Sequence, residues 1–134
     1  MDNQLSANHI RSISASMTIV ERMINDIENS LTTPYKGIYE RYDIDIAGEV
    51  INSNLRVIEE VRKRLVNMKS KYNLTSKSFG ISQVILSRKS RTWEVLQETV
   101  SRQLRGYGKF PEDLNISFDR EIQEFIDLIE QIKI

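Results

Sequence analysis

Apolar residues recur at alternating steps of three and four along most of the chain. The first stripe comprises Ile10, Ile13, Met17, Val20, Ile24, Ile27 and Leu31. An α-helix makes one turn in 3.6 residues, so this spacing places the side chains on one face. No Pro or Gly interrupts the stretch. It predicts a long amphipathic helix that ends near Leu31, with Asp2 or Ser6 as its N-cap.

Two further long helices follow from the same pattern. The second stripe comprises Ala47, Ile51, Ile58, Val61, Leu65, Met68 and Tyr72. Asp43 or Asp45 is the expected N-cap of this helix. The third helix is predicted over residues 81–104 without a break, and Trp93, the only Trp, lies near its middle. We expect Trp93 to be a buried anchor of the core.

A fourth helix is predicted from Asn115 or Ser117 to the end of the chain. Its apolar face comprises Phe118, Ile122, Phe125, Ile126, Ile129 and Ile132. Residues 73–80 and 105–113 have the composition of loops, and no stretch shows the apolar–polar alternation of a strand. These patterns predict an all-α protein in which residues 1–134 form one domain, an up-down-up-down four-helix bundle.

A short extra helix is predicted in the first connection, where Thr33 and Pro34 give a start signal. Three of the five tyrosines would share one face of it: Tyr35, Tyr39 and Tyr42. They are candidate docking aromatics for a protein partner. The alternative is that the rings cover one end of the core and keep their hydroxyls in water.

Composition narrows the class of protein. Of the 134 residues, 40% are hydrophobic and 28% are charged, as in an ordinary globular protein. The absence of Cys excludes disulfides and thiolate zinc sites. The polar opening residues do not resemble a secretion signal, and no apolar run is long enough to cross a membrane. We therefore expect a cytoplasmic protein with no membrane partner.

The net charge of zero conceals an uneven distribution. Residues 62–109 hold twelve Lys or Arg against two Glu, whereas residues 1–61 and 110–134 each have a net charge of −5. Such asymmetry is consistent with an anionic partner. It is also consistent with basic and acidic helices that neutralise each other inside an antiparallel bundle.

One basic stripe is a candidate binding surface. In a continuous third helix, four arginines fall within an arc of about 100°. With two residues of the following loop, the candidate anion-binding residues are Arg88, Arg91, Arg102, Arg105, Tyr107 and Lys109. Phosphates of a nucleic acid would bind such a stripe. Glu94 and Glu98 lie on the same arc, however, which favours an ordinary solvated face.

Residue types that support catalysis are scarce. His9 is the only His, and Glu121, Glu124 and Asp127 share a helix face without a matching acidic motif elsewhere. The sequence Gly106-Tyr107-Gly108 lacks the context of a phosphate-binding loop. We expect no catalytic, metal or cofactor site.

These observations predict a non-enzymatic interaction or regulatory module that binds a protein partner or a second copy of itself. The alternative is a nucleic-acid-binding protein that uses the basic face of the third helix.

Overall fold

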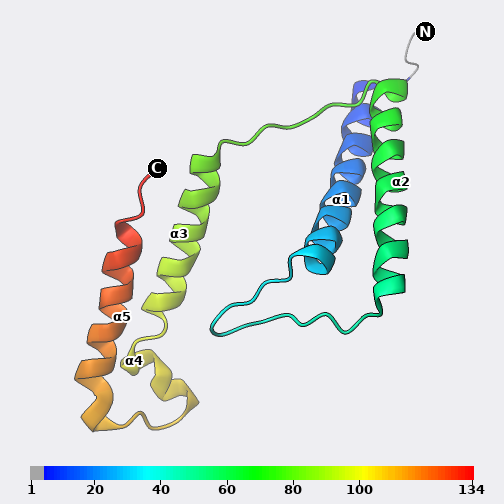
Figure 1. The fold of residues 1–134 in the computed structure, drawn as a ribbon. Coiled ribbons are helices and arrows are strands. Elements are labelled where there is room, and N and C mark those ends of the chain that lie inside the picture. The colour runs from blue at the N-terminus through cyan, green and yellow to red at the C-terminus, as the bar shows by residue number, and fades with distance from the viewer. Residues whose placement is uncertain (1–4) are drawn as a thin grey trace. The chain divides into compact units, whose positions relative to one another are not determined.

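The computed structural model describes residues 5–134, and these residues contain helices but no strand, which confirms the all-α class. The predicted cap Asp2 lies outside the described residues. The chain divides after Lys77 into two compact units (Figure 1). Each unit is built on an antiparallel pair of helices. The single bundle of four helices stays a prediction.

Helix α1, Ala7–Thr32, begins where the sequence indicates, because the Ser6 Oγ accepts a hydrogen bond from the backbone N–H of His9 at 3.1 Å. Helix α2, Gly48–Tyr72, begins later than predicted. Its N-cap is Ala47, not Asp43 or Asp45. The Asp43 carboxylate instead accepts a hydrogen bond from Lys36 Nζ at 2.6 Å, within the connection between the helices.

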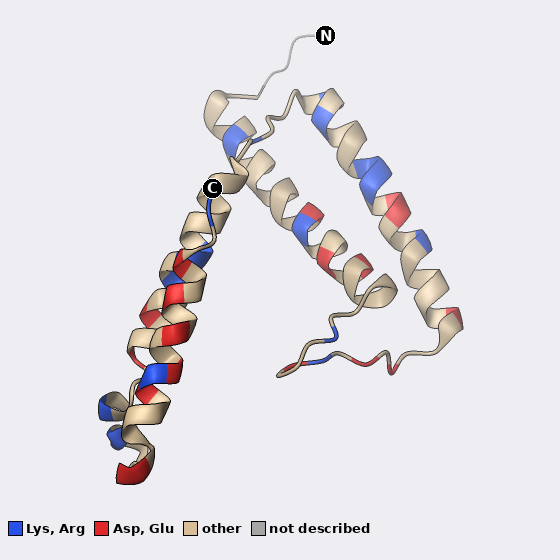
Figure 2. Cartoon of the chain, turned by 60° about the vertical axis from the view of Figure 1, so that its left-hand side comes forward, with Lys and Arg blue, Asp and Glu red and all other residues tan. Residues whose placement is uncertain are grey.

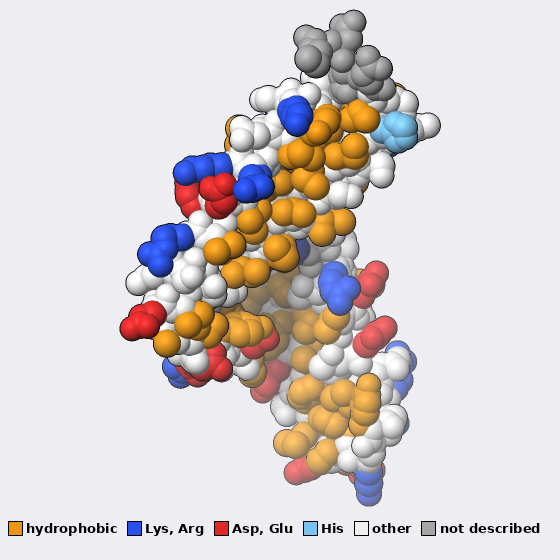
Figure 3. Space-filling view, turned by 90° about the vertical axis from the view of Figure 1, so that its right-hand side faces the viewer, with side chains coloured by type: hydrophobic (Ala, Val, Ile, Leu, Met, Phe, Trp, Pro, Cys, Tyr) orange, Lys and Arg blue, Asp and Glu red, His pale blue; other side chains and the backbone are white. Residues whose placement is uncertain are grey.

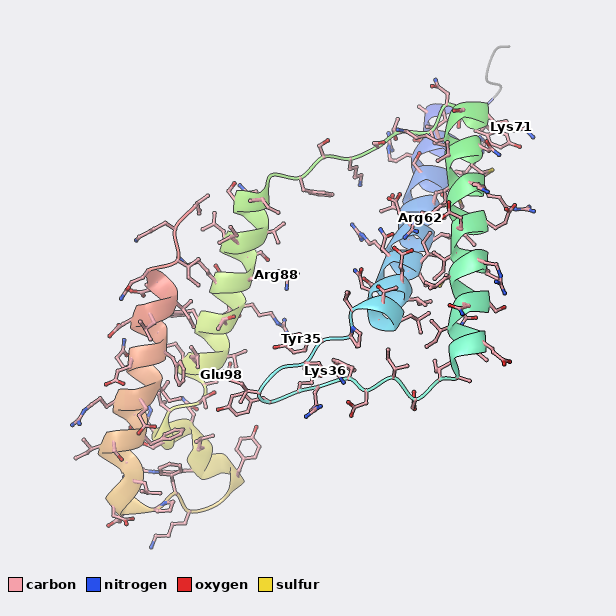
Figure 4. The ribbon with its side chains drawn as sticks, viewed as in Figure 1. Tyr35, Lys36, Arg62, Lys71, Arg88 and Glu98 are labelled. Carbon is pink, nitrogen blue, oxygen red and sulfur yellow. The ribbon has the colours of Figure 1, made fainter. Side chains whose placement is uncertain are left out.

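The two helices of the first unit pack through a narrow apolar seam. Ile24 of α1 and Ile58 of α2 are buried, as is Leu74 just beyond α2. At one edge of the seam Arg62 reaches from α2 to α1 (Figure 4) and donates two hydrogen bonds to the Glu28 carboxylate, at 2.7 and 2.9 Å. The Glu28 carboxylate of α1 thus neutralises the charge of Arg62 on α2.

The predicted extra helix between α1 and α2 is wrong. The connection is extended, and an isolated antiparallel bridge joins Lys36 to Arg41. The turn is closed by Gly37 N–H donating to the Glu40 carbonyl at 2.8 Å and by Tyr42 N–H donating to the Tyr35 carbonyl at 2.9 Å. Glycine and aromatic residues favour this tight turn over a helix of eight residues.

The second unit contains α3, Ile81–Gln97, and α5, Asn115–Glu130. The predicted continuous helix to Leu104 is wrong, since α3 ends at Gln97 and the short α4, Ser101–Leu104, starts anew. Two 3₁₀ turns, Arg105–Tyr107 and Glu112–Leu114, lead to α5. The N-cap of α5 is Leu114, so neither Asn115 nor Ser117 caps it as predicted.

Helix α5 faces α3 and α4 through Ile122 and Ile126, which are buried. The rings of Phe110 and Phe118 pack at 5.1 Å between centroids. Three expected core residues of this unit are at the surface instead: Trp93 is 47% exposed, Phe125 55% and Ile132 51%. A pair of helices covers only one stripe on each partner, and the apolar faces of α3 and α5 are wider than that.

The pairing of Arg62 with Glu28 makes stability depend on pH. The Arg62 hydrogen bond lowers the pKa of Glu28 from its ordinary value of 4.5. A carboxyl group whose pKa is lower in the folded chain stabilises the fold above its ordinary pKa. That contribution is lost as the pH falls through the pKa of the folded chain.

We expect Glu28→Gln to reduce the free energy of unfolding at pH 7 and to have little effect at pH 2, as measured by urea denaturation. The control is Glu60→Gln, which removes the exposed 3.4 Å pair with Arg64 inside α2 and should have the smaller effect. An equal loss at both pH values for Glu28→Gln would contradict the assignment.

Candidate functional site

A hollow lies at the C-terminal end of α1, against the connection to α2. Its volume is about 460 Å³. The walls combine aliphatic side chains with tyrosines and carboxylates. They comprise Asp26, Asn29, Ser30, Leu31, Thr33, Pro34, Tyr35, Tyr42, Asp43, Ile44, Asp45 and Ile46. The size is that of a small-molecule pocket.

The structure brings together two of the three predicted docking tyrosines. Tyr35 and Tyr42 line the hollow, whereas Tyr39 is 99% exposed at the tip of the turn. The Tyr42 hydroxyl donates to the Glu40 carboxylate at 2.5 Å, and this hydrogen bond raises the pKa of Tyr42. The tyrosines therefore do not form the single helix face that the sequence suggested.

One lining residue of this hollow, Tyr35, lies against a glycine. A Cβ at Gly37 would lie 2.5 Å from the Tyr35 hydroxyl oxygen and 2.7 Å from its ring. The Tyr35 ring can lie over the turn only because residue 37 has no side chain. Sequence reasoning missed this contact.

The predicted basic stripe is divided by the break in the third helix. Arg88 and Arg91 lie on α3, whereas Arg102 lies on α4 and Arg105 in the 3₁₀ turn after it. All four are exposed, as are Tyr107 and Lys109. Within residues 5–134, no carboxylate lies within ion-pair distance of any of these arginines. They are available to solvent but do not share one helix face.

Asp119 of α5 fixes the start of α4 after the break. Its carboxylate accepts hydrogen bonds from the backbone N–H and the hydroxyl of Ser101, both at 2.7 Å. These two hydrogen bonds lower the pKa of Asp119, and the positive charge of Arg105 contributes. An acceptor supplied by another helix thus satisfies a backbone donor that α4 leaves unpaired.

A second depression, of about 370 Å³, runs between α3 and α5. We call it the α3–α5 groove. Its lining comprises Leu86, Lys89, Ser90, Trp93, Glu94, Leu96, Ile126, Ile129 and Glu130. Sequence reasoning did not find this groove, because Trp93 was assigned to a closed core. Arg88 and Arg91 are not part of its lining.

No protein-family model, no curated protein and no solved structure matches the chain.

Two features were sought in the described residues: a cluster of metal ligands and a helix that could span a membrane. Nowhere in residues 5–134 do three His, Cys, Asp or Glu side chains gather as they would around a metal ion. Across the same residues, no helix combines the length and apolar character needed to cross a lipid bilayer.

Replacing Gly37 by Ala should displace the Tyr35 ring from the turn with little loss of stability, because the crowded atoms belong to a side chain that can rotate. The measurement is loss of nuclear Overhauser contacts between the ring and residue 37. Gly106→Ala is the control, since a Cβ there meets no atom within 4 Å. Unchanged ring contacts in Gly37→Ala would refute the close approach.

Asp119→Ala should speed amide hydrogen exchange at Ser101 and unwind α4, because the backbone donor loses its acceptor. Asp119→Asn keeps one acceptor oxygen and should give an intermediate rate. Glu124→Ala, on the same helix, is the control for removal of a carboxylate. If exchange at Ser101 does not change in Asp119→Ala, the carboxylate does not hold α4.

Proposed function

We propose that the chain is a cytoplasmic, non-enzymatic interaction module that binds a protein partner through apolar helix faces. The observation that supports this most directly is an uncovered apolar face on the first unit. Ile19 is 66% exposed, Met23 52% and Ile27 40%. Because they recur every four residues, they form one stripe along α1.

Helix α2 contributes to the same face. Val50 and Val57 are 48% and 58% exposed and lie seven residues apart, on one stripe. Met23 directly precedes the buried Ile24, and Val57 directly precedes the buried Ile58. Each exposed stripe therefore lies about 100° from the buried seam, in the same direction around its own helix. Because the two helices are antiparallel, this direction places both stripes on the same side of the helix pair.

Figure 3 shows hydrophobic side chains gathered in a band along the α1–α2 unit. An apolar band of this kind on a helix pair is typical of a surface that another protein covers. On α2 the seven-residue spacing of Val50 and Val57 continues to Arg64, and basic residues gather toward the C-terminal end of this helix (Figure 2). The part of the band along α1 therefore resembles the core of an interface, and the basic end of α2 resembles its rim.

The predicted up-down-up-down bundle is the competing arrangement, because it would bury this face within the chain. A bundle of four helices buries one apolar face of each pair. A partner protein or a second copy would bury the same face from outside. The bundle, the dimer and the complex with a partner protein differ in the molecular mass of the crosslinked product at α1. One crosslinking experiment therefore distinguishes them.

A photo-crosslinking amino acid at position 23, in the organism that makes the protein, should yield one discrete adduct with a partner protein. The same amino acid at position 66 is the control, since Val66 is 66% exposed, against 52% for Met23, but lies on another side of α2. Adducts at both positions, a crosslink only within the chain, or a crosslink to nucleic acid would overturn the proposal.

Met23→Glu should then weaken the crosslinked partner about tenfold or more, because a charge would enter an apolar contact. Its effect on the free energy of unfolding should stay within about 0.5 kcal/mol, since the side chain is half exposed in the unit. A partner that binds Met23→Glu as tightly as the natural chain uses another surface.

A further inference from the structure

The α3–α5 groove has an apolar floor contributed by both helices. Leu86, Trp93 and Leu96 come from α3. Ile126 and Ile129 come from α5. The floor is open, because Leu86 is 43% exposed and Trp93 is 47% exposed. A large indole surface left half in water is a favourable anchor for a ligand that can cover it.

The charged side chains of the groove are mostly acidic. Glu94 is contributed by α3 and Glu130 by α5. Within the described residues, neither has an ion pair or a side-chain hydrogen bond. A positive charge bound in the groove would therefore find carboxylates on both helices.

The one basic residue of the lining is already engaged. Lys89 Nζ donates a hydrogen bond to the Ile132 carbonyl at 2.6 Å, just beyond the end of α5. A cation at the C-terminal end of a helix is favoured by the helix dipole. Lys89 keeps its positive charge, so the lining has a net charge of −1, and neither Glu94 nor Glu130 forms an ion pair with it.

From this geometry we infer that the groove binds an amphipathic helix of a partner protein, with apolar residues on one face and Lys or Arg beside them. The inference rests on the proposed function and names the chemistry of a partner. A shallow channel between two antiparallel helices fits a third helix, which inserts side chains at steps of three and four. A Lys or Arg of that helix can pair with Glu94 or Glu130 and lie against the Trp93 ring.

The same charges argue against a nucleic acid in this groove. Two carboxylates would repel a phosphate backbone, and none of the candidate anion-binding residues of the sequence analysis lines it. The exposed arginines lie outside the lining, although Arg91 precedes Glu94 by one helical turn.

Trp93 provides the readout, because it is the only Trp of the chain and lies in the groove. The probe is a synthetic helical peptide of about 18 residues, with Leu on one face and Lys on both flanks. Titrated into the full chain, it should shift Trp93 emission to shorter wavelength and saturate. A matched peptide in which Glu replaces every Lys should bind at least about tenfold more weakly.

Variants of the full chain assign the effect to the two carboxylates. Glu94→Gln combined with Glu130→Gln should weaken the Lys peptide about fivefold to tenfold and reduce the salt dependence of its binding. Glu121→Gln combined with Glu124→Gln makes the same change of net charge outside the groove and should leave the affinity unchanged. Equal weakening by both pairs would reduce the result to net charge and overturn the inference.

Two further outcomes are decisive. Equal binding of the Lys and Glu peptides, or binding of neither, excludes a basic amphipathic partner for the groove. Met23→Glu, on the first unit, should not change the peptide affinity. If the peptide fails while the crosslink at position 23 still forms, only this inference falls and the interaction module stands.

Discussion

The structure depends on how much apolar surface one pair of antiparallel helices can cover. Two helices meet along one stripe each, and burial of that stripe is the main source of stability. In the first unit the seam holds Ile24 and Ile58, and in the second it holds Ile122 and Ile126. The apolar faces of the helices are wider than these seams, so each unit presents hydrophobic side chains to solvent. A binding function follows more naturally from this excess than from any polar constellation in the described chain.

Helix positions could largely be predicted from the sequence, because hydrophobic periodicity is a local property. Ser6 was one of the two caps predicted for α1, and the C-terminal ends of α1 and α2 agree with the pattern to within a residue. The wrong predictions concern segments whose conformation depends on a residue distant in sequence or on a backbone interaction. The break before α4 depends on Asp119, eighteen residues beyond Ser101, and no local pattern reveals that acceptor. The connection after α1 depends on the approach of Tyr35 to Gly37.

The candidate site was less predictable than the helices. Of the three docking tyrosines, Tyr35 and Tyr42 share a hollow, but they come together through a turn and not through a helix. Trp93 shows the limit most clearly. Its spacing places Trp93 on the apolar side of α3. Spacing alone does not show whether the neighbouring helix is wide enough to cover this part of the apolar side. The predicted anchor of a closed core is instead the largest side chain of an open groove.

The uneven charge along the chain is only partly neutralised inside the units. Arg62 pairs with Glu28 across two helices, and Arg64 pairs with Glu60 within one. Lys89 is satisfied by a carbonyl at a helix end and not by a carboxylate. Arg88 and Arg91 remain exposed on the same helix whose groove displays Glu94. A net charge of zero therefore does not mean that each surface is neutral. On α3 the two signs lie close together, because Lys89 shares the groove with Glu94 and Arg91 precedes Glu94 by one helical turn.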